Sequence, residues 1–416
     1  MGRFAEIGRS LDSPFPGADN TAVSDAFIAA AVRTPIGRFL GALGAIPAPK
    51  LGALVVREAI RRAHVPADAV DEVLMGSVLQ AGLGQNPARQ AALGGGLPHK
   101  VGAVTINMVC GSGLKALIFG AQAIMAGDAD IVVAGGMESM TNAPYLLPEA
   151  RRGTRLGNAK LVDSLVHDGL WDVFNDFHMG TSCELVAERF RVTRRDMDEF
   201  SEGSHRKAIA AARSGAFKAE TVAVETKGDK GEAKVVDADE GPREDSTVEK
   251  LGKIKPAFKP DGVVTAGNAS QISDGAAAAV LMSDKALQTH GVAPLARITG
   301  YATAGVDPKW VLVSTIDAVR RFDERNPWKA AAADLIEINE AFAGSTVAAI
   351  RDLGLDAAKV NVNGGAVALG HPIGCSGARI VVTLLHALAD RRLKRGLATL
   401  CMGGGNGLAM SVELVG

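Results

Sequence analysis

The chain has 416 residues, of which 47% are apolar and 22% are charged, and its formal net charge is -1. This length favours two or three domains, and the composition is typical of a soluble globular protein rather than a disordered or nucleic-acid-binding one. The longest charge-free apolar stretches are shorter than the ~20 residues that cross a bilayer or are broken by Gly, Asn or Pro, so we expect no membrane span.

Residues 1–24 are polar and mix basic with acidic side chains. Transit peptides are poor in acidic residues, so we interpret this segment as an N-terminal extension rather than a targeting signal. A chain of this length with four cysteines and no secretory signal fits a reducing, cytoplasmic compartment better than a disulfide framework. The four are Cys110, Cys183, Cys375 and Cys401.

The first half of the chain shows a helix followed by a strand. Apolar residues recur at helical spacing from Leu114 to Met125, and the run 131–134 predicts a strand that ends at Gly135-Gly136.

Between the halves, residues 143–269 differ in character, with basic residues from Arg151 to Arg155 and a charged, proline-containing stretch from 227 to 259. We interpret 143–269 as an inserted loop, or lid, domain.

The second half repeats the plan of the first. A helical stripe runs from Ile380 to Leu388, and the strand predicted over 397–402 ends at three glycines. The segments Cys110-Gly-Ser-Gly and Gly374-Cys-Ser-Gly each open the helical pattern of their half. We therefore predict a duplicated α/β unit, with one domain at 25–142 plus 270–295 and the other at 296–416.

Strands that alternate with helices favour a mainly parallel sheet with ligands beyond the carboxyl ends of its strands. Two polar side chains stand at such ends. Cys401 lies in the strand before the triple glycine, and Asn339 follows the apolar run 335–338. The amide of Asn339 could donate a hydrogen bond to a ligand, or the residue could cap the next helix.

Cys110 is the best candidate for a nucleophile. It stands in Asn-Met-Val-Cys-Gly-Ser-Gly, directly before a predicted helix, where the helix dipole and free N–H groups would lower the pKa of its thiol. An isolated cysteine is more often a small buried residue. The glycine-rich turn, which leaves backbone N–H groups free to face a ligand, favours the reactive interpretation.

His371 and Cys401 are candidates for the acid and base. Gly370 and Pro372 flank His371, so a rigid turn holds the imidazole, although a structural role is the alternative. Cys401 alone would more often belong to a core, but the N–H groups of the glycines after it could form an oxyanion hole. Cys183 and Cys375 are expected to serve packing. The remaining histidines outside the lid motif described below are expected to be structural: His64, His99, His167, His205, His290 and His386.

Two other kinds of site fit the sequence less well. Paired Cys or His residues at zinc spacing do not occur around these residues, which argues against a metal site. Gly111-Ser-Gly113-Leu-Lys-Ala116 matches a dinucleotide-binding fingerprint, which would make the protein a nicotinamide oxidoreductase. That alternative leaves Cys110, His371 and Cys401 without a role.

Four motifs, in this order, resemble those of the thiolase family. They are Asn-Met-Val-Cys110-Gly-Ser-Gly, Asn339-Glu-Ala-Phe, Gly370-His371-Pro-Ile-Gly and Cys401-Met-Gly-Gly-Gly. The similarity extends from about residue 26 to the C-terminus. It implies duplicated thiolase-like α/β/α layered domains with an inserted loop domain, and the activity of an acetyl-CoA acetyltransferase.

The resemblance also implies a role for each reactive residue. Cys110 would become acetylated after activation by His371, and Cys401 would remove the α-proton of a second acetyl-CoA or protonate the enolate in reverse. Asn339, through a held water, and the ring of His371 would form one oxyanion site. The backbone N–H groups of Cys110 and Gly403 would form the other.

Contacts with coenzyme A (CoA) follow from the same resemblance. Arg243 would lie near the nucleotide and Ser270 near the pantetheine, with Phe258, Ala266 and Phe342 along the channel. The segment Phe-His178-Met179-Gly resembles the pocket segment of short-chain biosynthetic thiolases and favours a four-carbon product. A broader or longer-chain 3-ketoacyl-CoA thiolase and a non-catalytic acyl-CoA-binding protein are the alternatives.

The expected ligands are acetyl-CoA, acetoacetyl-CoA and CoA, the last as a substrate or product rather than a cofactor. We expect no metal, nucleic acid or membrane partner. The family resemblance further implies a homotetramer, to which the basic loop from Arg151 to Arg155 could contribute a contact.

Overall fold

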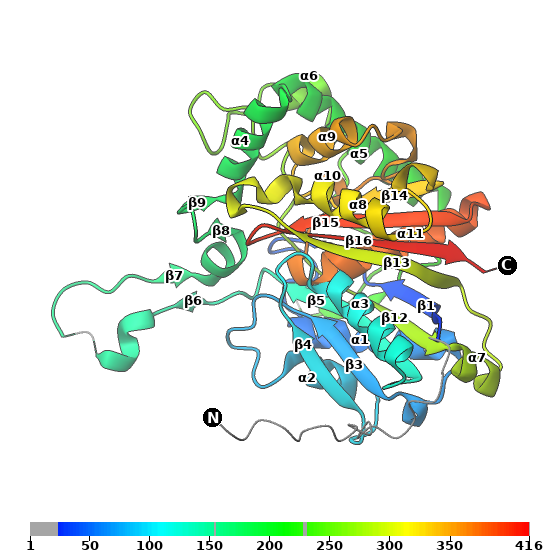
Figure 1. Cartoon of the computed structure of the whole chain (residues 1–416). Coiled ribbons are helices and arrows are strands. Elements are labelled where there is room, and N and C mark those ends of the chain that lie inside the picture. Colours follow the sequence, from blue (N-terminus) through cyan, green and yellow to red (C-terminus); the bar gives the residue numbers. More distant parts are fainter. Residues whose placement is uncertain (1–23, 154, 228–230, 416) are drawn as a thin grey trace, which may run out of the picture.

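The computed structural model describes residues 24–153, 155–227 and 231–415. Its centre is a large sheet whose strands follow the order β14-β15-β16-β13-β1-β12-β5-β3-β4, with the short β2 (Gly37–Arg38) paired to β12 (Figure 1). Helices cover the sheet, and the segment between β5 and β12 forms a separate layer of helices and an extended arm.

The sheet consists of two halves that repeat one strand order. The first half has β1 (Ala26–Arg33), β3 (Glu72–Gly76), β4 (Gly102–Ile106), β5 (Ile131–Ser139) and β12 (Ser273–Ser283). The second has β13 (Ala296–Gly305), β14 (Leu335–Ile338), β15 (Arg395–Met402) and β16 (Asn406–Leu414). In each half the first strand lies at the middle of the sheet, where β1 and β13 pair antiparallel.

The correspondence between the two halves extends to the outer edge of the sheet. Val360 forms an isolated parallel bridge with Ile336 of β14, in the position that β4 has beside β3. The predicted duplication is therefore confirmed.

The prediction of a mainly parallel sheet is wrong. Among the strands that the structure describes, the pairs β3–β4, β3–β5 and β14–β15 are parallel and the other pairs of the large sheet are antiparallel. The reason is that the last strand of each half runs back beside its predecessor. β16 follows β15 through a tight glycine turn, and β12 returns beside β5 after the lid.

Two helices occupy the corresponding place in each half and pack against each other. They are α3 (Ser112–Ala126) and α11 (Ile373–Arg391). A Cβ on Gly113 would lie 2.8 Å from the backbone nitrogen of Ala378, and one on Gly377 would lie 2.4 Å from that of Leu114. Glycine is therefore required where these helices cross, which explains the repeated Ser-Gly in both halves.

Further helices cover the outer faces. α1 (Ala48–Ala63) and α2 (Pro87–Gly94) share a core with the first half, and α8 (Ser314–Arg325) shares one with the second. Shorter helices are α7 (Asp284–His290) and α10 (Ala366–Leu369). Apolar residues of α3 and α11 lie in one core cluster with strands of both halves, so these helices form the middle layer.

The lid begins after β5 and ends before β12. It holds α4 (Met179–Phe190), α5 (Arg194–Ser214) and α6 (Val248–Leu251), of which α4 and α5 pack on α9 (Ala343–Asp352) of the second half. It also holds the strand pairs β6 (Tyr145–Leu146) with β7 (Val162–Asp163), β8 (Trp171–Asp172) with β9 (Phe177–His178), and β10 (Val224–Lys227) with β11 (Ala233–Val236). The arm that carries β6 and β7 projects away from the rest of the chain (Figure 1). The expected lid boundaries at 143 and 269 stay predictions.

Two helical segments of the described chain are long and apolar enough to cross a membrane by length and composition alone. They are Val109–Ala126 and Ile373–Arg391, and 56% and 83% of these windows are buried inside the fold. Both belong to the middle layer, where their apolar side chains contact the sheet.

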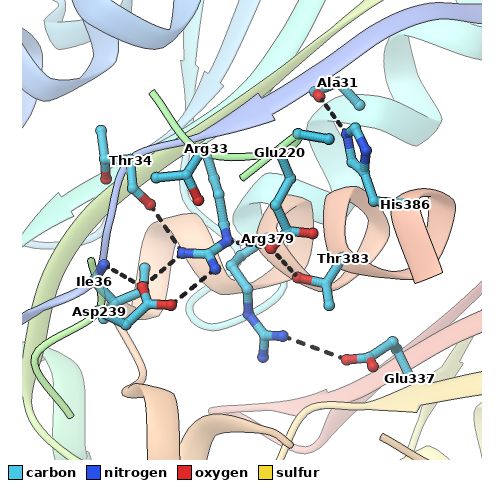
Figure 2. Close-up of polar contacts among 12 residues, drawn as sticks. Ala31, Arg33, Thr34, Ile36, Glu220, Asp239, Glu337, Arg379, Thr383 and His386 are labelled. Atoms are coloured by element: carbon cyan, nitrogen blue, oxygen red, sulfur yellow. Dashed lines mark hydrogen bonds and ion pairs between the residues drawn. The ribbon is translucent and has the colours of Figure 1, made fainter. Parts of the chain in front are cut away.

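A buried arginine ties the lid to the first half (Figure 2). Nε of Arg33, at the end of β1, contacts Glu220 at 2.5 Å, and Nη1 contacts Asp239 at 2.6 Å. The side chains of Arg33 and Glu220 are fully buried, and that of Asp239 is 5% exposed. Thr383 of α11 also donates to Glu220, so the cluster joins three layers of the fold.

Replacing Arg33 with Met should therefore destabilise the protein strongly. The substitution keeps much of the volume but leaves the carboxylates of Glu220 and Asp239 buried without a cation, which typically lowers the free energy of unfolding by about 3–5 kcal/mol. Urea unfolding measures this change. The matched control is Arg61→Met, which breaks an exposed pair with Glu58 within one helix. An equal loss of unfolding free energy in Arg33→Met and Arg61→Met would contradict this account of Arg33.

Candidate active site

A cavity of about 460 Å³ opens where α3, α11 and β15 meet the lid. Its wall combines residues from both halves with residues from the lid. Every site residue predicted from the sequence lines it except Asn339 and Arg243. Those in the wall are Cys110, His178, Met179, Phe258, Ala266, Ser270, Phe342, His371, Cys401 and Gly403.

A strained turn presents Cys110 at the start of α3. Val109 has a φ of 47°, a left-handed conformation that is a genuine outlier for a β-branched residue. The side chain of Asn107 accepts from Val109 N–H at 3.0 Å, and the Ser112 hydroxyl donates to Val109 C=O at 2.6 Å. Local strain of this kind is concentrated at functional sites.

The Cys110 thiol is protonated at rest. Burial raises its pKa to about 12, although the backbone N–H groups of Gly403 and of Cys110 itself act in the opposite direction. The expectation of a lowered pKa is therefore wrong, because the loss of water around the sulfur outweighs the helix N-terminus. A base must remove the proton when Cys110 reacts. The two N–H groups converge beside the sulfur, as an oxyanion site requires.

His371 lies at the start of α11, the counterpart of α3. Gly370 before it has a φ of 117°, and a Cβ there would lie 2.2 Å from the Ser273 hydroxyl, so only glycine fits. The N–H of His371 donates to Gln271 C=O at 2.9 Å. Burial, with a smaller effect of Arg379, lowers the pKa of the imidazole to about 3. The ring is therefore neutral near pH 7 and can accept a proton.

Ser376 fixes which nitrogen accepts that proton. Its hydroxyl donates to Pro372 C=O at 2.9 Å, and its oxygen lies 2.6 Å from Nδ1 of His371. Because the hydroxyl hydrogen is used, we assign Nδ1 as the protonated nitrogen and Nε2 as the free acceptor. Sequence reasoning missed Ser376, although its place in the repeated Cys-Ser-Gly and Gly-Ser-Gly segments offered a signal.

Ser376→Ala should lower kcat by roughly 10-fold and leave KM nearly unchanged, because it weakens but does not remove general base catalysis, which typically provides about 10²–10⁴-fold. Without the Ser376 oxygen as acceptor for Nδ1–H, the ring can adopt the tautomer with its hydrogen on Nε2. In that tautomer Nε2 cannot accept a proton. Steady-state kinetics across pH would show this, with Ser201→Ala as control because Ser201 makes one comparable buried bond to Met197 C=O in α5. Equal kcat values for the two variants would contradict the assignment.

Asn339 lies behind His371 rather than in the cavity wall. Its Nδ2 is 3.4 Å from both ring nitrogens, so the amide lies against the face of the imidazole. Its Oδ1 is buried and has no hydrogen-bond partner in the described chain, so it can accept from a bound molecule. The alternative that Asn339 caps the next helix is wrong, because α9 begins at Ala343 and Phe342 occupies its N-cap position.

Cys401 faces the same cavity from β15. The turn after it contains Gly404 and Gly405, both with a φ of 82°, and leads directly into β16. Burial raises the pKa of the Cys401 thiol strongly, and the nearby Cys110 raises it further. A neutral thiol with a high pKa is a weak acid at rest and a strong base once ionised.

Aromatic side chains contact one another in the cavity wall. His178 stacks on Phe258 with ring centres 4.8 Å apart, and Phe258 meets Phe342 edge to face at 6.4 Å. A Cβ on Gly180 would lie 2.3 Å from the Phe258 ring, so this glycine makes the stacking possible. Nδ1 of His178 accepts from Gly180 N–H at 3.0 Å, which leaves Nε2 as the N–H donor of the neutral ring.

The structure does not bring Arg243 into this cavity. Arg243 lines a different cavity in the lid, next to His205. Its predicted contact with the nucleotide of CoA stays a prediction.

Protein atoms fill the space beside the glycines of the dinucleotide-binding fingerprint. A Cβ on Gly111 would lie 2.1 Å from the Met402 sulfur, and Gly113 contacts α11 as described above. The N-terminus of α3 therefore has no open surface at these glycines for a pyrophosphate. Across the residues that the structure describes, no group of three or more His, Cys, Asp or Glu side chains is arranged to hold a metal ion.

Comparison with known proteins identifies the family. Residues 26–285 match the family model of the thiolase N-terminal domain, and residues 292–414 match that of the thiolase C-terminal domain. The chain belongs to the thiolase family.

Relatives of this thiolase cover nearly its full length. An acetyl-CoA acetyltransferase of Pseudomonas aeruginosa is 54% identical over 390 residues, which are 94% of this chain and 99% of the relative. One of Cupriavidus necator is 52% identical over 391 residues, 94% of this chain and 100% of the relative. The crystal structure of the Bacillus anthracis acetyl-CoA acetyltransferase superposes with a TM-score of 0.93 at 44% identity, and covers 95% of this chain and 100% of its own. The predicted layered thiolase fold is thus confirmed.

Proposed function

We propose that this thiolase is an acetyl-CoA C-acetyltransferase. It would condense two acetyl-CoA molecules to acetoacetyl-CoA and CoA, and catalyse the reverse thiolysis. The observation that carries this proposal is the meeting of the Cys110 thiol, the neutral His371 ring and the Cys401 thiol in the wall of one cavity. The acetyl-CoA acetyltransferases that are about half identical to this chain support it.

In the first half-reaction, Nε2 of His371 takes the proton of Cys110 while the sulfur attacks the thioester carbonyl of acetyl-CoA. The bond from the carbonyl carbon to the CoA sulfur breaks, and the CoA thiolate takes the proton back from His371. CoA leaves as a thiol and the acetyl group stays on Cys110. Negative charge on the carbonyl oxygen is stabilised by the N–H groups of Cys110 and Gly403.

In the second half-reaction, Nε2 of His371 takes the proton of the Cys401 thiol, and the resulting Cys401 thiolate removes an α-proton from a second acetyl-CoA. The resulting carbanion attacks the acetyl carbonyl, a carbon–carbon bond forms, and the bond from the carbonyl carbon to the Cys110 sulfur breaks. The Cys110 thiolate then takes the proton from Nε2 of His371, which restores the resting state. The enolate oxygen is stabilised by Nε2–H of His371 and by Asn339 through a water. In the thiolysis direction the neutral thiol of Cys401 protonates the enolate, a role that its raised pKa suits.

The acyl group of the substrate should be short. His178 and Met179 belong to the cavity wall together with Phe258, so the lid limits the space beside the reactive thiols. Ala266, Ser270 and Phe342 lie along the same wall and would contact the pantetheine arm. A longer-chain 3-ketoacyl-CoA thiolase is the second candidate, because a volume of about 460 Å³ also has room for a longer acyl group.

An assay of thiolysis and condensation separates these candidates. The wild type should release CoA from acetyl-CoA and cleave acetoacetyl-CoA faster than a longer 3-ketoacyl-CoA. A preference for the longer substrate would favour the second candidate. If the wild type bound CoA esters without turnover, the protein would instead be a non-catalytic acyl-CoA-binding protein. The proposed reaction uses CoA as substrate and product and needs no separate cofactor.

The assembly would be a homotetramer. The projecting arm carries large exposed apolar side chains, including Tyr145 (65% exposed) and Leu156 (98% exposed), beside the basic residues Arg151, Arg152 and Arg155. A monomer rarely exposes such a segment without a partner. Light scattering should give the mass of four chains, and a monomer would count against this proposal. The four free cysteines favour a reducing, cytoplasmic location.

A further inference from the structure

A buried carboxylate contacts the segments that adjoin Cys110 and His371. It belongs to Glu138, which is 0% exposed, stands near the end of β5 and does not line the catalytic cavity. The proposed mechanism gives it no role. A carboxylate is almost never fully buried unless polar groups compensate for the lost water, so the contacts of Glu138 indicate what it does.

Three backbone N–H groups donate to Glu138. Its Oε2 accepts from Val78 at 3.0 Å and from Gly374 at 2.9 Å, and its Oε1 accepts from Leu79 at 3.1 Å. Val78 and Leu79 follow β3, whereas Gly374 lies in the first turn of α11. An ionised carboxylate only accepts hydrogen bonds, so it can satisfy three donors that converge from two segments. Glu138 therefore links α11 to the segment after β3.

One end of this link holds the turn that carries His371. Gly374 lies three residues after His371 along the chain. A Cβ on Gly374 would lie 2.7 Å from Oε2 of Glu138, and a Cβ on Gly136 of β5 would lie 2.1 Å from the Gly374 carbonyl oxygen. Both positions must be glycine for the start of α11 to come this close to β5. The hydrogen bond from Gly374 N–H thus fixes the start of α11, and with it the turn that carries the imidazole.

The other end of the link adjoins Cys110. Val78 and Leu79 belong to one small core cluster, and Val109 and Cys110 pack against it. The charge of Glu138 also acts on the thiol, since burial is the main cause of the raised pKa of Cys110 and this carboxylate raises it further. Glu138 therefore contacts, through two backbone segments, the surroundings of both groups that exchange the first proton.

We infer that Glu138 is a positioning residue for acetyl transfer, which holds Cys110 and His371 at the separation that proton transfer between them requires. The inference rests on the proposed function, because that proton transfer belongs to its first half-reaction. Glu138 acts through the backbone and exchanges no proton with the substrate. Misplacement of reacting groups by about 1 Å can lower a rate by roughly 10²-fold, so loss of this link should have a large effect on kcat.

The link depends on the charge of Glu138, because a protonated carboxyl accepts less well from three N–H groups. Burial raises the pKa of Glu138 to about 7, the three N–H groups oppose this rise, and the charge of Asp274 in β12 adds to it. The other titratable groups that interact with Glu138 are the thiols of Cys110 and Cys375, which burial keeps neutral with pKa values of about 12. The segment 77–79 carries no ionisable side chain. Lowering the pH through 7 should therefore protonate Glu138 and lower the kcat of the wild type.

Glu138→Gln tests the link with a side chain of nearly the same shape. One acceptor oxygen becomes an NH₂ donor that faces backbone N–H groups, so at least one hydrogen bond is lost. The kcat for thiolysis of acetoacetyl-CoA should fall by about 10–10²-fold with KM nearly unchanged, and the remaining activity should no longer decrease below pH 7. Urea unfolding of each variant gives its folded fraction, so kcat is expressed per folded enzyme.

Asp334→Asn is the matched control. Asp334 also accepts from two backbone N–H groups of another segment, those of Lys394 at 3.0 Å and Arg395 at 2.8 Å. It lies directly before β14, at the opposite end of that strand from Asn339. This variant should lose stability but keep the kcat and the pH profile of the wild type.

Two results would rule out the positioning role. One is a kcat per folded enzyme that is equal in Glu138→Gln and Asp334→Asn. The other is a lowered kcat in Glu138→Gln with the pH profile of the wild type, which would mean that Glu138 serves the fold alone. A wild type without thiolysis or condensation would instead overturn the proposed function, and this inference with it, so the wild-type assay distinguishes the two failures.

Discussion

Cys110→Ala should abolish release of CoA from acetyl-CoA and thiolysis of acetoacetyl-CoA, with a fall in kcat of at least about 10⁴-fold. Both half-reactions pass through a thioester on this sulfur, and alanine offers no nucleophile. The neighbouring Cys401 cannot replace it, because its thiol lies in β15, away from the strained turn at Val109 that presents Cys110. Coupled assays of free CoA in both directions measure this loss.

Cys375→Ala is the matched control. Cys375 is a free thiol in the first turn of α11, but it is fully buried in the core between the two halves. Its removal should lower stability through a small cavity and leave kcat close to that of the wild type. If Cys375→Ala lost as much activity as Cys110→Ala, the assignment of the nucleophile would have to be abandoned.

Cys401→Ala should separate the two half-reactions. Acetylation of Cys110 needs only His371 and the N–H groups of Cys110 and Gly403, so a burst of CoA release from acetyl-CoA should remain. The carbon–carbon step lacks its acid and base, so condensation and thiolysis should fall by about 10²–10⁴-fold. Rapid quench of the burst, compared with the steady-state rate, measures both effects in one experiment.

Cys183→Ala serves as the control for Cys401. The two cysteines belong to one core cluster, and Cys183 does not line the catalytic cavity. Its loss should change stability but not the ratio of burst to steady-state rate. An absent burst in Cys401→Ala would mean that this thiol also takes part in acetylation, contrary to the proposed division of roles.

The sequence revealed the reactive residues because their setting is local. Glycines flank Cys110, His371 and Cys401 in short segments, and the structure uses them for local geometry, as at Gly370 with its φ of 117°. Other predicted residues of the cavity wall, such as Phe258, Ala266 and Phe342, came from the resemblance to the thiolase family. The duplicated helix that follows Cys110 and His371 was likewise visible in the Ser-Gly repeat, because close helix packing restricts the residue at each crossing.

Features that depend on distant residues could not be predicted. Arg33 meets Glu220 and Asp239 across 187 and 206 residues of sequence, and nothing local indicates this pairing. The raised pKa of Cys110 likewise results from burial by several segments, which outweighs the local effect of the helix N-terminus. The predicted strand directions were wrong for a similar reason. The order of helices and strands along the sequence does not show whether a strand pairs parallel or antiparallel with its neighbour in the sheet.

The most direct test of the proposed function is the site of acetylation. Wild-type protein would be incubated with acetyl-CoA alone, quenched in acid, digested and analysed by mass spectrometry, with released CoA counted in parallel. The proposed mechanism predicts one acetyl group on the peptide that contains Cys110 and one equivalent of CoA per active site in the burst. An acetyl group on Cys401 instead, or CoA release with no acetylated cysteine, would contradict it.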